Sequence, residues 1–68
     1  MQIQLNGEPF ELPEDGEATL AALIEARGLG GHRLAVEVNE ELVPRSEHAA
    51  HPLHPGDRVE IVQAIGGG

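Results

Sequence analysis

The sequence predicts an α+β fold in which a mixed sheet of about five strands packs on one main helix. Several short segments alternate apolar and polar residues, which is the pattern of half-buried strands. Only one segment has apolar residues at helical spacing, and two Asn-led residue pairs stand where tight turns would join neighbouring strands. With 68 residues, the chain is expected to form one small domain.

The first predicted element is a β-hairpin. Apolar and polar residues alternate over residues 1–5, and Asn6-Gly7 follows as a strong signal for a type I′ turn. Phe10 and Leu12 continue the alternation and define the partner strand. The chain is therefore expected to open with two antiparallel strands.

A short helix is predicted next. Pro13 and the acidic stretch 14–17 end the strand pattern, Thr19 is suited to cap a helix, and Gly28 is placed to end it. One face of this helix would consist of Leu20, Leu23 and Ile24. At about nine residues, the helix would need tertiary packing to persist.

A second hairpin is predicted after the helix. Residues 34–38 alternate, Asn39-Glu40 forms a tight turn, and a brief strand around residues 42–43 ends at Pro44.

The remainder of the chain is expected to be irregular over residues 45–57, where Pro52 and Pro55 interrupt any regular element, and then to form a last strand over 58–63. A parallel pairing of the first and last strands at the sheet centre would be typical of a β-grasp, although pattern alone leaves the strand order open. The predicted core consists of Leu5, Phe10, Leu12, Leu20, Leu23, Ile24, Leu34, Val36, Val38, Val59 and Ile61.

Charge and composition exclude several functions. Twelve acidic and four basic residues give a net charge of −8, which disfavours nucleic acids and anionic membranes. Such a surface suits a basic protein partner, or it simply keeps the protein soluble. There is no Cys, no signal-peptide pattern and no apolar run long enough to span a bilayer, so we expect a cytoplasmic protein.

The side chains offer little catalytic chemistry. Ser46 is the only serine and has no nucleophile-elbow motif around it, and no phosphate-binding glycine loop is present. We therefore expect a protein that is not an enzyme and that binds no cofactor of its own.

A histidine cluster is the main competing site. His48, His51 and His54 recur at steps of three and could form an open zinc site. Because Pro52 and Pro55 prevent a regular helix, this spacing does not place the three rings on one face. A solvated loop without metal is the favoured interpretation.

The C-terminal glycines are the strongest functional signal. We expect residues 1–63 to form the domain and residues 64–68 a flexible tail that ends in Gly66, Gly67 and Gly68. A tail without Cβ atoms could thread a narrow active site of a partner. Adenylation of the Gly68 carboxylate, followed by displacement of AMP by sulfur, would give a thiocarboxylate. Val62 and Ile65 beside the tail are candidate docking residues, the alternative being scattered apolar surface.

The motifs point to a known family. They are Asn6-Gly7-Glu8, the helix 20–24, Ala35-Val36-Glu37-Val38-Asn39, Val43-Pro44-Arg45-Ser46, the strand Gly56-Asp57-Arg58-Val59-Glu60-Ile61-Val62 and the terminal glycines. Over essentially its whole length the chain resembles the ThiS family of sulfur carriers in thiamine biosynthesis. That family is related to MoaD and to ubiquitin in the β-grasp fold.

The resemblance implies a substrate for other enzymes. A ThiF-like adenylating enzyme would use ATP to activate Gly68, sulfur would come from a cysteine desulfurase or another persulfide donor, and a ThiG-like thiazole synthase would accept it. Two departures are the additional Gly66 and His48, where the family often has an aromatic residue. Alternatives are a MoaD-like carrier for molybdopterin synthesis, a ubiquitin-like modifier, or a non-covalent interaction domain.

Overall fold

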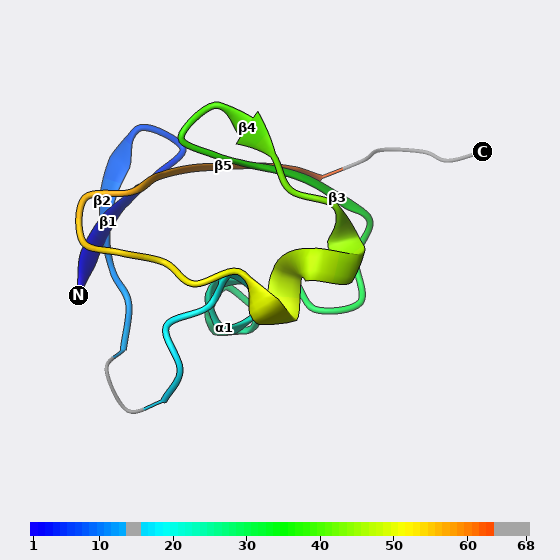
Figure 1. Cartoon of the computed structure of the whole chain (residues 1–68), viewed down its shortest axis with the longest axis horizontal. Coiled ribbons are helices and arrows are strands. Elements are labelled where there is room, and N and C mark those ends of the chain that lie inside the picture. The colour runs from blue at the N-terminus through cyan, green and yellow to red at the C-terminus, as the bar shows by residue number, and fades with distance from the viewer. Residues whose placement is uncertain (14–15, 64–68) are drawn as a thin grey trace.

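The computed structural model describes residues 1–13 and 16–63. A curved sheet lies over one α-helix and one 3-10 helix (Figure 1). In chain order the elements are β1 (Gln2–Leu5), β2 (Glu8–Glu11), α1 (Leu20–Ala26), β3 (Leu34–Val38), β4 (Glu41–Leu42), the 3-10 helix η1 (Arg45–Ala50) and β5 (Arg58–Gln63).

Both predicted hairpin turns are confirmed. Asn6 and Gly7 have φ of 51° and 83°, and Asn39 and Glu40 have φ of 50° and 72°. A type I′ turn needs positive φ at both central residues, and its twist matches that of the strands it joins. Asn tolerates this left-handed conformation better than most residues, which explains its place at the start of each turn.

The sheet has the order β2-β1-β5-β3-β4. Strand β1 pairs in parallel with β5, the central strand, and β5 pairs antiparallel with β3. The parallel pairing of first and last strands, with α1 on one face, confirms the predicted β-grasp. In the described part of the chain, no helix covers the other face of the sheet (Figure 1).

Helix α1 has seven residues rather than about nine, and its ends are as predicted. The Thr19 hydroxyl oxygen accepts a hydrogen bond from the Ala22 N–H at 3.2 Å. After the C-cap at Arg27, Gly28 has a φ of 71°, the left-handed conformation that commonly ends helices. The predicted apolar face is confirmed, because Leu20, Leu23 and Ile24 are all buried.

The core agrees with the prediction except at a few positions. Phe10 and Leu34 are only partly buried, whereas Ile3, Val43 and Leu53 are core residues that the predicted core did not include. Phe10 lies on the edge strand β2, and Leu34 is at the very end of β3 opposite Gln63, so each has fewer neighbours. The buried apolar residues are Ile3, Leu5, Leu12, Leu20, Leu23, Ile24, Val36, Val38, Val43, Leu53, Val59 and Ile61.

The prediction that residues 45–57 are irregular is wrong for its first half. Pro44 precedes η1, and its carbonyl accepts from the Glu47 N–H at 2.9 Å, the spacing of a 3-10 helix. The segment after η1 is hydrogen-bonded to the residues just before α1, since the Leu53 N–H donates to the Ala18 carbonyl at 2.7 Å. No helix in the described ranges is long and apolar enough to cross a membrane.

Candidate functional site

Strand β5 leads toward the C-terminal glycines, so its position defines the candidate site. Its residues alternate, with Val59 and Ile61 buried against the helix side and Val62 exposed to 64% on the open face. Val62 is one of the two docking residues that the sequence indicated. The other, Ile65, and the tail glycines 66–68 lie outside the described residues.

A small aliphatic area surrounds Val62 on the open face. Val62 lies directly opposite Ala35 of β3, and Leu42 of β4 lies opposite Glu37, one step along β3 on the same face. Leu42 is exposed to 69%, and it and Val62 are the large hydrophobic side chains that stand exposed within residues 1–13 and 16–63. We call Ala35, Leu42 and Val62 the open-face patch.

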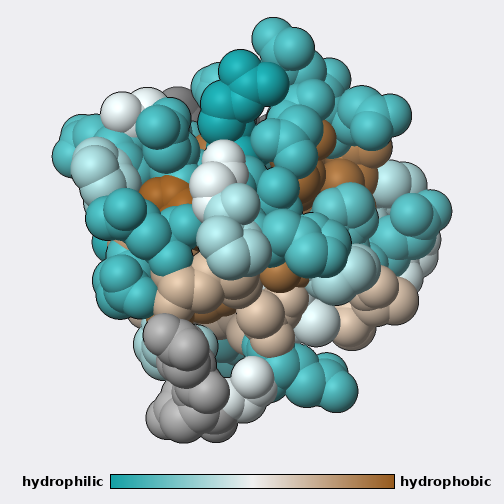
Figure 2. Space-filling view, turned by 60° about the vertical axis from the view of Figure 1, so that its left-hand side comes forward, coloured by the Kyte–Doolittle hydropathy of each residue, from teal (hydrophilic) through white to brown (hydrophobic). Residues whose placement is uncertain are grey.

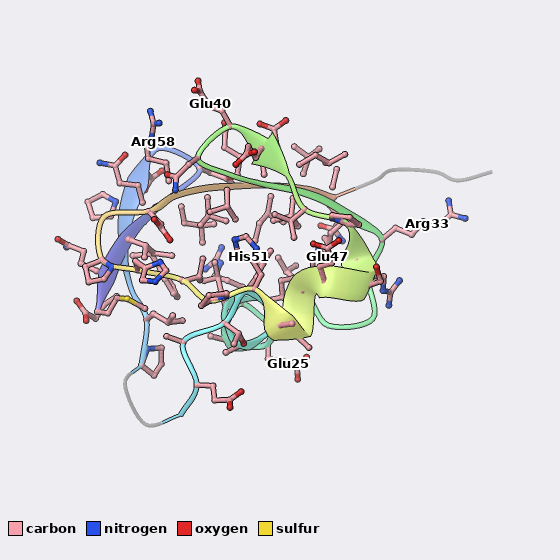
Figure 3. The ribbon with its side chains drawn as sticks, in the orientation of Figure 1. Glu25, Arg33, Glu40, Glu47, His51 and Arg58 are labelled. Atoms are coloured by element: carbon pink, nitrogen blue, oxygen red, sulfur yellow. The ribbon has the colours of Figure 1, made fainter. Side chains whose placement is uncertain are left out.

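Two carboxylates adjoin this patch. Glu37 and Glu60 lie directly opposite each other on β3 and β5, both exposed on the open face. Directly opposed like charges destabilise a sheet, so this pair favours a cation brought by a partner. Glu40 and Arg58 also project from the side of the sheet away from α1 (Figure 3). The face of the molecule in Figure 2 is mostly hydrophilic, with smaller hydrophobic areas between the polar side chains.

The turn asparagines fix β5 in place. The Asn6 side-chain oxygen accepts from the Ile61 N–H at 2.8 Å, and the Asn6 amide donates back to the Ile61 carbonyl at 3.3 Å. At the other end, the Asn39 side-chain oxygen accepts from the Arg58 N–H at 3.0 Å. The two turns therefore continue the hydrogen-bonding ladder onto β5 with side-chain groups, one at each end.

The predicted solvated loop of histidines is wrong for His48. His48 is buried rather than solvated, and its Nε2–H donates to the Val43 carbonyl oxygen at 3.1 Å. His54 is exposed and His51 half-buried, and no three His, Cys, Asp or Glu side chains in the described part of the chain are grouped to hold a metal ion. The His48 side chain is the buried residue of η1 and bonds to the backbone of Val43, so its role is structural.

The fold and the direction of β5 define a class. A five-stranded mixed sheet with parallel first and last strands, packed on one helix and followed by terminal glycines, is that of a ubiquitin-like β-grasp protein. The ThiS family model matches residues 3–68. The chain belongs to the ThiS family of sulfur carrier proteins.

Individual relatives agree with this assignment. The chain is 39% identical over 66 residues to the sulfur carrier protein ThiS of Thermus thermophilus, covering 97% of this chain and 98% of that protein. The crystal structure of the thiamine biosynthesis protein ThiS of Geobacter metallireducens superimposes with a TM-score of 0.82 at 28% identity, over the whole of both chains.

A longer relative also matches. A thiazole synthase of Paramagnetospirillum magneticum is 40% identical over all 68 residues, and the chain corresponds to 20% of that protein's length.

Sequence reasoning did not single out Leu42, Glu37 and Glu60 as neighbours of Val62. Strand alternation already assigned Glu37 and Glu60 to a polar face. Only the strand order and register bring them beside Val62 and Leu42, because residues 43–57 separate β5 from β3 and β4 in the sequence.

Proposed function

We propose that this protein carries sulfur on the α-carboxylate of Gly68 for formation of the thiazole of thiamine. The observation that supports this most directly is the family match, which extends through the terminal glycines to residue 68. The chain is then a substrate of other enzymes. The proposal requires that Gly68 ends in a free carboxylate.

The chemistry takes place at one carbonyl carbon. A Gly68 carboxylate oxygen attacks the α-phosphorus of ATP, the bond to pyrophosphate breaks, and an acyl adenylate forms. A sulfide equivalent then attacks the carbonyl carbon and AMP leaves, which gives the thiocarboxylate. A ThiF-like adenylating enzyme supplies the ATP site, and a persulfide donor such as a cysteine desulfurase supplies the sulfur. When the donor is a persulfide, a thiol must afterwards cleave the S–S bond.

The open-face patch is the proposed docking surface. Val62 and Leu42 expose aliphatic area next to the base of the tail, and the opposed Glu37 and Glu60 lie beside them. A partner surface with an apolar centre and an adjacent Arg or Lys complements both features. Ile65 and the tail residues Gly66 and Gly67 would continue this contact into the partner's active site.

Thiazole synthase is the proposed acceptor of the sulfur. Proteins with that name from Paramagnetospirillum magneticum and Magnetococcus marinus contain a stretch that matches this entire chain, at 40% and 38% identity. A stretch similar to this chain within proteins of that name supports thiazole synthase as the partner that accepts the sulfur. The resemblance to a thiamine biosynthesis protein in structure points to the same pathway.

The test is the intact mass of the protein after incubation with ATP, sulfide and the adenylating enzyme. The mass of the untreated protein must match a chain that ends at Gly68. We expect a gain equal to the exchange of one oxygen for one sulfur, lost again when thiazole synthase and its other substrates are added. A semisynthetic chain ending in the Gly68 amide serves as the control. Thiazole formation with that amide at the normal rate would overturn the proposal.

A further inference from the structure

Strand β5 extends beyond its neighbour β1. The two strands pair only at Gln4 with Arg58 and at Leu5 with Val59. On its other side β5 pairs with β3 up to the last residue, Gln63 opposite Leu34. Figure 1 shows β1 and β2 together at the end of the sheet where β5 begins, far from the end toward which β5 runs. The last part of β5 therefore has a strand on one side only.

Backbone groups along β5 point alternately to its two neighbours. The carbonyls of Asp57 and Val59 accept from the β1 side at 2.9 Å each, and Ile61 bonds there to the Asn6 side chain. Because this direction repeats every second residue, the N–H and C=O of Gln63 face the same side. No backbone or side-chain group in the described ranges bonds to them.

A groove lies beside this open edge. It has a volume of about 200 Å³ and is lined by Leu5, Asn6, Arg27, Leu29, Ile61 and Gln63. A second hollow of about 290 Å³ next to Phe10 shares the lining residues Leu5, Asn6 and Arg27, so the two hollows adjoin the same side chains. The Arg27 guanidinium stands 5.9 Å from the Phe10 ring centre and forms no ion pair within the described residues. The groove thus combines a backbone edge, aliphatic walls and a cation.

The other two edges of the sheet are protected against pairing. Edge strand β2 contains Pro9 and the charged residues Glu8 and Glu11, and edge strand β4 has only two residues. Proline, charge and short length are the usual means by which proteins prevent pairing at sheet edges. The edge at Gln63 is also short, because Ile61 already bonds to Asn6, but it has neither proline nor a charged residue, and its two open backbone groups face a groove.

The net charge of the protein argues against a second copy of the chain as the occupant. A second copy would bring another net charge of −8 and be repelled. We propose that the groove binds an extended segment of the thiazole synthase, which adds as a strand beside the end of β5. Its backbone bonds to the N–H and C=O of Gln63, and an acidic side chain pairs with Arg27. The choice of this enzyme as partner rests on the proposed function.

Gln63→Pro tests the backbone contact. Proline removes the N–H that faces the groove but no ladder bond to β3, because Gln63 directs its backbone groups away from β3. Gln63→Ala is the matched control, since it keeps the N–H and also loses the side-chain contact of Gln63 Nε2 with His32 Nδ1 at 2.7 Å. By calorimetric titration with thiazole synthase, we expect Gln63→Pro to bind about tenfold more weakly than Gln63→Ala. Equal affinity of the two variants would overturn the inference.

Arg27 provides a second pair of variants. We expect Arg27→Glu to weaken binding to the synthase several-fold more than Arg27→Gln, because only the former repels an acidic residue of the partner. Unfolding curves of all four variants show whether the fold is intact. Equal effects of Arg27→Glu and Arg27→Gln would contradict the proposed acidic contact.

Amide hydrogen exchange of the ¹⁵N-labelled chain tests the backbone contact of Gln63 without a mutation. We expect the Gln63 amide to exchange at least about tenfold more slowly in the complex with the synthase. Unchanged exchange in a saturated complex overturns the inference while the sulfur-carrier role stands. Slow exchange in the free chain at high concentration also overturns it, since the occupant would be a second copy. Failure of the proposed function is seen separately, as absence of the thiocarboxylate mass.

Discussion

The side chain of Asn6 bonds to the backbone of Ile61 in both directions, although 55 residues separate them in sequence. The Ile61 N–H donates to Asn6 Oδ1 at 2.8 Å, and Asn6 Nδ2 donates to the Ile61 carbonyl at 3.3 Å. The Asn6 side chain thereby makes the hydrogen bonds that a further residue of β1 would make to β5. These bonds hold β5, the strand that precedes the tail, against the first hairpin.

Replacement of Asn6 tests this contact. We expect Asn6→Gly to lower the free energy of unfolding by about 1–3 kcal/mol, because two backbone groups of Ile61 lose their partners. Glycine accepts the φ of 51° at this position without strain, so the loss contains no backbone strain but includes the greater conformational entropy of glycine in the unfolded chain. Urea denaturation gives the value. Asn6→Ala should be less stable still, and a fully stable Asn6→Gly would contradict the role of the side chain.

Leu23 on α1 is fully buried, with 0% of its surface exposed. Leu23→Ala should lower the free energy of unfolding by about 2–5 kcal/mol, the range for removal of a buried leucine. In so small a domain this could abolish folding. The matched control is Leu42→Ala on the open face, which we expect to change stability by less than about 0.5 kcal/mol. Similar unfolding midpoints for the two variants would show that Leu23 is not a core residue.

His48 and His54 provide a contrast within one cluster. His48→Ala should destabilise the protein by about 1–3 kcal/mol, because the buried Val43 carbonyl loses its donor. His54 has a side chain that is 72% exposed, and His54→Ala should be nearly neutral. Thermal denaturation separates the two. If the His48→Ala and His54→Ala variants are equally stable, His48 has no structural role. Tight zinc binding by the wild type that is lost when His48, His51 and His54 are all replaced by alanine would instead support a metal site.

The open-face patch predicts a binding defect without a folding defect. The double variant Leu42→Ala/Val62→Ala should bind the adenylating enzyme at least about tenfold more weakly, since each fully buried aliphatic side chain contributes about 1.5–3 kcal/mol and about 1.4 kcal/mol corresponds to tenfold in affinity. Gln4→Ala, on the same face but outside the patch, is the control. Binding is measured by titration and stability by urea denaturation. An unaltered affinity of the double variant would remove the patch from the docking surface.

The tail is tested by Gly67→Val. A β-branched side chain would obstruct a narrow channel that admits glycine, so we expect adenylation of Gly68 to be lost. Pyrophosphate release by the adenylating enzyme measures this step. We expect the unfolding curve to match that of the wild type. A Gly67→Val chain that is adenylated at the normal rate would show that the tail does not thread such a channel.

The local structure was readable from the sequence because it depends on neighbours in the chain. The type I′ turn at Asn6-Gly7 and the tight turn at Asn39-Glu40 follow from the turn preference of their asparagines, and the helix cap at Thr19 from one hydroxyl and the next turn of the helix. Alternation along each strand likewise assigned Val62 to the outer face. The glycines at 66–68 and the strand motif before them were enough to indicate the family.

Tertiary structure decided which of these elements meet. Register alone sets Glu37 opposite Glu60, and it leaves Gln63 unpaired on one side because β1 ends before β5 does. Tertiary packing also buries His48 and Leu53, which belong to a proline-containing stretch without a regular apolar pattern. Such contacts join residues distant in the chain, and their energy comes from burial and hydrogen bonds that exist only after the sheet has formed. No periodicity within a single segment encodes them.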